Sequence, residues 1–67
     1  MTQKEIREVL DPIAEAIREA GLVPYDQIYG YFQTGNPMYI TRRNDAREKI
    51  LMIDKGVIQE YLKLIDR

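Results

Sequence analysis

The sequence predicts an all-α fold: a small bundle of about four short helices in one domain that covers residues 1–67. Apolar residues recur every three to four positions along the whole chain, which is the spacing of an amphipathic helix. No alternation of apolar and polar residues is long enough to indicate a strand. Glycines and prolines divide the chain into segments at Gly21, Pro24, Gly35, Pro37 and Gly56.

The first helix is predicted over residues 3–20. Pro12 interrupts this segment because it has no N–H to donate and its ring crowds the preceding turn. Either a new helix starts with Asp11 as its N-cap, or one helix continues through Pro12 with a kink. We favour the kinked helix because the apolar positions keep their phase across the proline. Gly21 should end it in a left-handed conformation. The apolar positions are Ile6, Val9, Leu10, Ile13, Ile17 and Ala20.

The second helix is predicted over residues 24–34, and it holds most of the aromatic residues of the chain. Pro24 suits the first turn of a helix, and Gly35 suits the position just after its end. Residues 37–41 should form an irregular connector. One face of the helix is expected to lie in the core, and it carries Tyr25, Ile28, Tyr29 and Phe32.

The opposite face of this helix contains a glycine at position 30, which costs about 1 kcal/mol relative to alanine in a helix interior. A close-packed neighbour would offset that cost because glycine lets another backbone approach. The sequence therefore predicts that a second chain packs on this face; the alternative is a glycine tolerated in a weak helix. The predicted dimer or partner face consists of Gln27, Gly30, Tyr31 and Thr34.

The third helix is predicted over about residues 44–53, with Asn44 or Asp45 as its N-cap. The fourth is predicted over about residues 57–66, with Gly56 as its N-cap. The two segments can also form one helix with a bend at Gly56. Residues expected to point inward are Ala46, Ile50, Ile53, Val57, Ile58, Tyr61, Leu62 and Ile65.

The composition excludes several classes of functional site. The chain contains no Cys, His, Ser or Trp, which excludes disulfides and zinc sites with Cys or His ligands and removes the commonest catalytic nucleophiles and bases. We therefore expect a protein that is not an enzyme and needs no cofactor or metal. No apolar run approaches the ~20 residues that span a bilayer, and no signal peptide is visible, so no membrane contact and a cytoplasmic location are expected.

The small size favours self-association. A domain of this length buries only about 60% of the surface that its unfolded chain exposes. Without disulfides or a metal, a partner chain is the remaining source of stability besides good helix packing. We expect a homodimer.

Arginines near the start of the third segment allow two interpretations. They could contact phosphate, as in a small helical nucleic-acid-binding protein, or bind a phosphorylated threonine of a partner. Alternatively they form a solvated patch that pairs with Asp45, Glu48 and Asp54. The net charge of −1 argues against nucleic-acid binding, because it gives no general attraction to phosphate. The arginines are Arg42, Arg43 and Arg47.

The centre of the chain carries a long motif. It reads Gly21-x-x-Pro24-x-x-Gln27-Ile28-x-Gly30-Tyr31-x-x-Thr34-Gly35-Asn36-Pro37-x-Tyr39-Ile40-x-Arg42, and Asp45-Ala46-Arg47 follows it. This motif resembles the signature of the IreB family of small regulatory proteins from low-GC Gram-positive bacteria. The resemblance extends from about residue 5 to residue 64 without an obvious gap.

This resemblance implies a helical homodimer without catalytic activity that regulates by binding a protein partner. IreB-like proteins are substrates of a transmembrane Ser/Thr kinase with extracellular PASTA repeats. They act as negative regulators of the response to cell-wall stress and of intrinsic cephalosporin resistance. Their phosphorylated threonines lie in an N-terminal tail, but here that tail is nearly absent and only Thr2 precedes the first helix. Thr2 is therefore the candidate phospho-acceptor.

Overall fold

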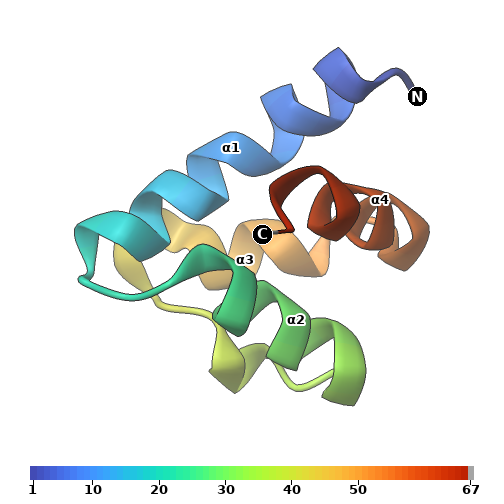
Figure 1. Cartoon of the computed structure of the whole chain (residues 1–67). Helices are drawn as coiled ribbons and strands as arrows, with labels where there is room; N and C mark the ends of the chain where they lie inside the picture. The colour runs from blue at the N-terminus through green and yellow to red at the C-terminus, as the bar shows by residue number, and fades with distance from the viewer. Residues whose placement is uncertain (67) are drawn as a thin grey trace.

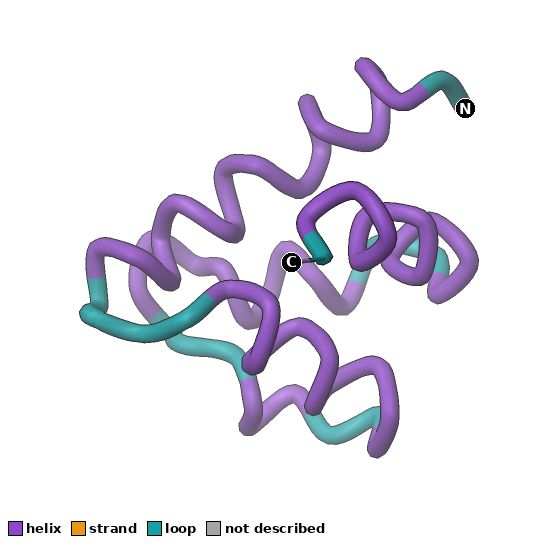
Figure 2. The backbone as a smooth tube through the Cα atoms, in the orientation of Figure 1, coloured by secondary structure: helices purple, strands orange, loops and turns teal. Residues whose placement is uncertain are grey.

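Six helical segments follow one another along residues 1–66, the part of the chain that the computed structural model describes (Figure 1). No strand occurs among these residues, and short loops join the segments (Figure 2). The predicted all-α class and the number of main helices are confirmed. The segments are α1 (Gln3–Glu19), α2 (Pro24–Thr34), the 3-10 turns η1 (Pro37–Tyr39) and η2 (Arg43–Asp45), α3 (Ala46–Leu51) and α4 (Lys55–Ile65).

Helix α1 is one continuous helix with Pro12 inside it. The prediction that the helix continues through the proline is confirmed, and Asp11 does not start a new one. At the C-terminal end, Gly21 has φ +80°. Its N–H donates to the carbonyl of Arg18 at 2.9 Å, and the N–H of Leu22 donates to the carbonyl of Ile17 at 3.1 Å. These two bonds satisfy carbonyls that the helix end would leave unpaired, as the glycine predicted.

The buried stripe of α1 differs in part from the prediction. Val9 is 41% exposed, and Ala20 is exposed as well, whereas Ala14 and Ala16 are buried. Val9 belongs to the N-terminal half of α1, which extends beyond α2 in Figure 1. The apolar pattern correctly predicted which side of α1 faces the core. How many residues on that side are buried depends on the segments that pack against the helix.

Helix α2 has the predicted bounds, and Gly35 follows it with φ +71°. Its buried side differs from the prediction: Tyr29 is 43% exposed, whereas Tyr31 is only 5% exposed. The centre of the buried side is Ile28, which is fully buried. At ~100° per residue, Tyr31 lies about 60° from Ile28 around the helix axis and Tyr29 about 100°. The prediction that Tyr29 is a core residue was wrong for this reason, and Tyr25 and Phe32 are half-buried.

The third and fourth helices are separate, so the single bent helix is excluded. Asp45 directly precedes α3 but makes no side-chain cap, and both Asn44 (φ +53°) and Asp45 (φ +60°) are left-handed. Helix α4 begins at Lys55 with Asp54 as its N-cap, whose carboxylate accepts the N–H of Gly56 at 2.7 Å. The prediction of Gly56 as N-cap was wrong because an aspartate can pair with a free N–H at a helix start and a glycine cannot.

The core lies where α1 crosses the other helices. Helix α1 contacts α2, α3 and α4, and α2 also contacts α4 and η1. Every long helix contributes to this core, as does the connector between α2 and α3 through Ile40. The buried residues are Ile6, Leu10, Ile13, Ala14, Ala16, Ile17, Ile28, Tyr31, Ile40, Ala46, Ile50, Ile58, Tyr61 and Leu62.

Candidate interaction site on helix α2

The predicted partner face of α2 lies against the chain's own segment 36–41. Gln27 accepts the N–H of Thr41 through Oε1 at 3.0 Å. Thr34 accepts the N–H of Asn36 at 3.1 Å and donates its hydroxyl to the carbonyl of Gly30 at 2.8 Å. The remaining member of this face, Tyr31, is buried in the core. Segment 36–41 therefore folds back over α2, and hydrogen bonds at Asn36 and Thr41 hold its two ends to the helix.

Gly30 allows the aromatic ring of Tyr39 to lie against the backbone of α2. A Cβ atom at position 30 would lie 2.6 Å from Cδ1 and 3.1 Å from Cγ of Tyr39. A Cβ atom closer than 3.0 Å to another heavy atom forces that atom to move. Cγ and Cδ1 belong to the part of the ring nearest the Tyr39 backbone, so the ring cannot yield as the free end of a flexible side chain could. The close neighbour of Gly30 is therefore a ring of the same chain, whereas the sequence pattern had suggested a second chain.

The turn that follows α2 is built by the residues of the central motif. Asn36 is extended, as expected before a proline, and its side chain accepts the N–H of Met38 at 3.0 Å. Its carbonyl accepts the N–H of Tyr39 at 3.2 Å, and the side chain of Ile40 is fully buried. The predicted irregular connector thus contains an ordered 3-10 turn. The motif residues of this turn are Gly35, Asn36, Pro37, Tyr39, Ile40 and Arg42.

An apolar surface surrounds this turn. Met38 is 73% exposed and Tyr39 is 46% exposed, and Leu22 and Val23 from the loop before α2 are exposed to a similar degree as Tyr39. Between the loop and Tyr39 lies a hollow of about 440 Å³. We call Leu22, Val23, Met38 and Tyr39 the apolar patch. Sequence reasoning did not identify Leu22, Val23 and Met38, because an apolar residue in a loop carries no periodic signal.

A second aromatic surface lies on the other side of α2. The rings of Tyr25 and Tyr29 stack with centroids 5.7 Å apart and planes 9° from parallel. The hydroxyl of Tyr29 accepts a hydrogen bond from Nε2 of Gln33 at 2.6 Å. Stacking and this bond account for an exposed tyrosine at a position that was predicted to be core.

Two of the three candidate phosphate-binding arginines have partners within the chain. Arg43 pairs through Nε with Oε1 of Glu19 at 3.2 Å, and Arg47 donates through Nε to the carbonyl of Ile40 at 2.9 Å. Arg42 lines a hollow of about 360 Å³ together with Arg47 and two acidic residues, Asp45 and Glu48. The carboxylates beside Arg42 repel an anion such as phosphate, so this geometry does not support nucleic-acid binding.

Thr2 caps the N-terminus of α1. Its Oγ1 accepts the N–H of Glu5 at 3.2 Å, and its own N–H donates to Oε1 of Glu5 at 2.9 Å. The hydrogen bond from the Thr2 backbone lowers the pKa of the Glu5 carboxyl below its usual value. This reciprocal arrangement is a capping box, and the spacing Thr2-x-x-Glu5 is its sequence signal. Thr2 is exposed.

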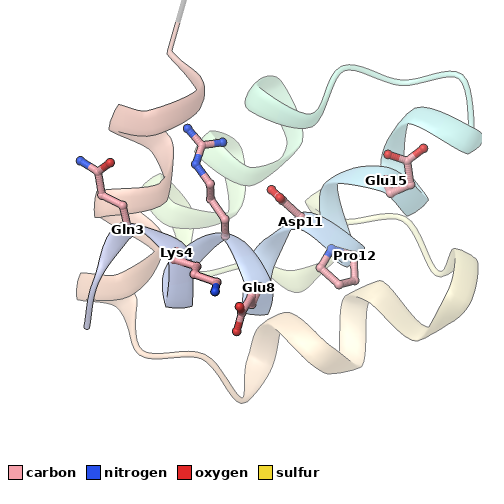
Figure 3. A pocket seen from close by; sticks show the side chains of 7 residues that line it. Gln3, Lys4, Glu8, Asp11, Pro12 and Glu15 are labelled. Carbon is pink, nitrogen blue, oxygen red and sulfur yellow. The ribbon is translucent and has the colours of Figure 1, made fainter.

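The outer side of α1 carries a broad, open hollow of about 760 Å³ around Pro12 (Figure 3). Charged residues of both signs line it, among them Lys4, Glu8 and Glu15. Asp11 in the same row accepts a hydrogen bond from the hydroxyl of Tyr61 at 2.6 Å. Burial, followed by this contact with Asp11, raises the pKa of Tyr61 above its usual value. The hollow combines mixed charge with little enclosure, so we assign it no ligand.

Along residues 1–66, no helix has the length and apolar character needed to cross a membrane. Fold and surfaces together define a small all-α protein whose notable exposed features are an apolar patch and a capped helix start. The family model described as IreB regulatory phosphoprotein matches residues 1–64 of the 67. The chain therefore belongs to the IreB family, which confirms the resemblance and gives the protein a regulatory role.

Proposed function

We propose that this protein is a non-enzymatic regulator that acts as a homodimer by binding other proteins in the cytoplasm of a Gram-positive bacterium. The family match over residues 1–64 carries this proposal. The exposed apolar side chains beside α2 support it, because apolar patches on small soluble proteins commonly mark contacts with other proteins.

The proposed dimer or partner face is the side of α2 that carries Gln27, Gly30, Tyr31 and Thr34, together with the segment 36–41 that covers it. Gly30 contributes from beneath this segment because the ring of Tyr39 lies against it, and Tyr31 is buried in the core below.

Sedimentation equilibrium at micromolar protein tests the dimer. We expect a species of twice the protomer mass of 7.9 kDa. A species of protomer mass at every concentration would contradict the proposal.

We further propose that the protein is a substrate of a transmembrane Ser/Thr kinase with PASTA repeats, with Thr2 as the phospho-acceptor. The family is one of phosphoproteins, and serine is absent from the chain. Thr34 both donates and accepts a hydrogen bond through its hydroxyl, and the hydroxyl of Thr41 accepts the N–H of Arg43 at 3.3 Å. Thr2 is exposed and precedes the first helix, and its hydroxyl accepts only the N–H of Glu5 among the bonds described above, so we propose it as the site.

Phosphorylation by the purified kinase domain, followed by intact-mass and fragment mass spectrometry, tests this site. We expect one added phosphate on the wild-type chain and on Thr34→Ala, and none on Thr2→Ala. Phosphate retained by Thr2→Ala would place the modification elsewhere. If the same kinase phosphorylates a generic substrate but never this chain, the substrate proposal fails.

The cellular role that we propose is negative regulation of the response to cell-wall stress and of cephalosporin resistance. Deletion of the gene in its native host should raise the cephalosporin concentration that stops growth, and a plasmid copy should restore the original value. Unchanged resistance after deletion, with susceptibility to an antibiotic of another target as the control, would refute this role.

A further inference from the structure

We propose that the capping box at the start of α1 is an autoinhibitory contact that slows phosphorylation of Thr2, because the box must open before a kinase can use the hydroxyl. This inference rests on the proposed phosphorylation of Thr2 and names what regulates it. It is carried by the engaged hydroxyl, the carboxylate beside it and the weak attachment of the first turn to the core.

The hydroxyl of Thr2 is held in the box as an acceptor. Its Oγ1 accepts the N–H of Glu5 at 3.2 Å, and this bond points the side chain toward the start of the helix. In phosphorylation, Oγ1 forms a bond to the γ-phosphorus of ATP as the bond to ADP breaks, and the hydroxyl proton passes to a base of the kinase. Oγ1 must therefore turn away from the Glu5 N–H toward the nucleotide, which opens the box.

The box also places a negative charge beside the hydroxyl. Oε1 of Glu5 accepts the N–H of Thr2 at 2.9 Å. This backbone hydrogen bond, followed by the bond with the Thr2 side chain, lowers the pKa of the Glu5 carboxyl, so the group is ionised at neutral pH. A carboxylate at this position repels the phosphates of ATP. Opening of the box moves the carboxylate away from the hydroxyl and reduces this repulsion.

The first turn of α1 is attached to the core at one point. Among residues 2–9, only the side chain of Ile6 is buried, and the others are exposed. The N–H of Ile6 donates to the carbonyl of Thr2 at 3.0 Å, which adds one backbone bond to the two bonds of the box. Releasing Thr2 from the helix breaks these three hydrogen bonds and no core contact. Local opening of this kind costs far less free energy than global unfolding.

The strength of the box therefore sets how often Thr2 is accessible. When opening and closing are fast compared with the reaction of the open form, the observed rate follows the open fraction. Loss of a helix cap destabilises a helix end enough to raise that fraction severalfold. Glu5 thus regulates the reaction of Thr2 through the folded chain, in addition to any contact that it makes with the kinase.

Three full-length variants separate the box from the charge. Glu5→Ala removes both bonds' side-chain partner and the charge, whereas Glu5→Gln keeps an acceptor for the Thr2 N–H without the charge. Glu8→Ala is the matched control, because Glu8 is exposed and lies outside the box. With the purified kinase domain, we expect Glu5→Ala to raise kcat/KM for Thr2 about threefold to tenfold. Glu5→Gln should raise it less, and Glu8→Ala should leave it unchanged.

Peptides of residues 1–12 separate opening of the box from recognition by the kinase. Isolated helices of this length are marginal in water, so in a peptide Glu5→Ala changes little besides the sequence that the kinase contacts. We expect the ratio of kcat/KM between Glu5→Ala and wild type to be at least about threefold larger in the full-length chain than in the peptide. Equal ratios overturn the inference, because Glu5 then acts through recognition alone.

Amide hydrogen exchange, followed by NMR, tests the box without a kinase. We expect the N–H of Glu5 to exchange at least about threefold more slowly in the full-length wild type than in the peptide, because it is bonded to Thr2. Exchange at the rate of the peptide would mean that the box does not stay closed, and the inference would be wrong whatever the kinase does.

The outcomes separate this inference from the proposed substrate role. If Thr2 is phosphorylated but Glu5→Ala gives no gain beyond that in the peptide, Thr2 remains the acceptor and the autoinhibitory contact is wrong. If a kinase that is active on a generic substrate phosphorylates Thr2 in neither the full-length chains nor the peptides, the substrate proposal fails and this inference fails with it.

Discussion

At position 30, a methyl group would collide with the ring of Tyr39, although alanine is the better helix former. Helix propensity and close packing therefore act in opposite directions at this residue. Because Gly30 is only partly buried, a substitution there reports on the contact with Tyr39 rather than on the central core.

A double-mutant cycle separates these two effects. We expect Gly30→Ala to lower the free energy of unfolding by about 1–3 kcal/mol because the added methyl group overpacks the contact. In a Tyr39→Ala background the same substitution should raise it by up to about 1 kcal/mol, since only helix propensity then remains. Urea denaturation measures all four chains. A stabilising effect of Gly30→Ala in the wild type would contradict the close approach.

The Tyr61 hydroxyl should make stability depend on alkaline pH. Its pKa is raised in the folded state, mainly by burial, so the native chain keeps the proton while an unfolded tyrosine ionises near pH 10. The resulting stabilisation is present below pH 10 and is lost as the pH rises above it.

We expect Tyr61→Phe to be less stable than wild type by about 1 kcal/mol at pH 8, because the bond to Asp11 is lost. This difference should shrink between pH 9 and pH 11. Denaturant unfolding at each pH measures it, and the other ionising groups cancel because both chains contain them. A difference that stays constant or grows with pH would contradict the assignment.

Among the elements, α1 combines a well-capped start with an interruption near its middle. The capping box at Thr2 and the left-handed Gly21 satisfy groups at its two ends. Pro12 has no N–H for the carbonyl of Glu8, so one bond of the helix ladder is absent. The exposed position of Pro12 means that replacing it disturbs no core contact.

Pro12→Ala should therefore stabilise the protein. We expect the free energy of unfolding to rise by about 1–3 kcal/mol, because the substitution restores a backbone hydrogen bond and removes the ring from the preceding turn. Glu15→Ala on the same exposed side serves as the control and should change stability by no more than about 0.5 kcal/mol. A lower unfolding midpoint for Pro12→Ala would show that the proline is required by the packing of α1.

For the whole molecule, stability and association are coupled if the proposed dimer forms. A chain of 67 residues has little core of its own, and a dimer is stabilised by mass action as the concentration rises. We expect the Tm of the wild type to increase steadily between 2 and 200 µM in calorimetry or circular dichroism. A Tm independent of concentration would indicate that folding does not depend on a second copy.

Local features of the chain could be predicted because each depends on a few neighbouring residues. Pro24 and Gly35 define the bounds of α2, and Gly21 defines the end of α1, through backbone conformations that only certain residues favour. The capping box of Thr2 and Glu5 and the N-cap at Asp54 also have local sequence signals, but helical periodicity does not reveal them because a cap lies outside the apolar stripe. The central motif, which depends on the order of residues alone, identified the family correctly.

Contacts between distant segments could not be predicted in the same way. Tyr61 meets Asp11 across 50 positions of the chain, and the ring of Tyr39 meets Gly30 only because the connector folds back over α2. The candidate site depends on this return, which brings Tyr39 to the hollow that Leu22 and Val23 also line. Periodicity shows that a helix has an apolar side, but the arrangement of neighbouring segments decides what covers it, because packing depends on position in space and not on spacing along the chain.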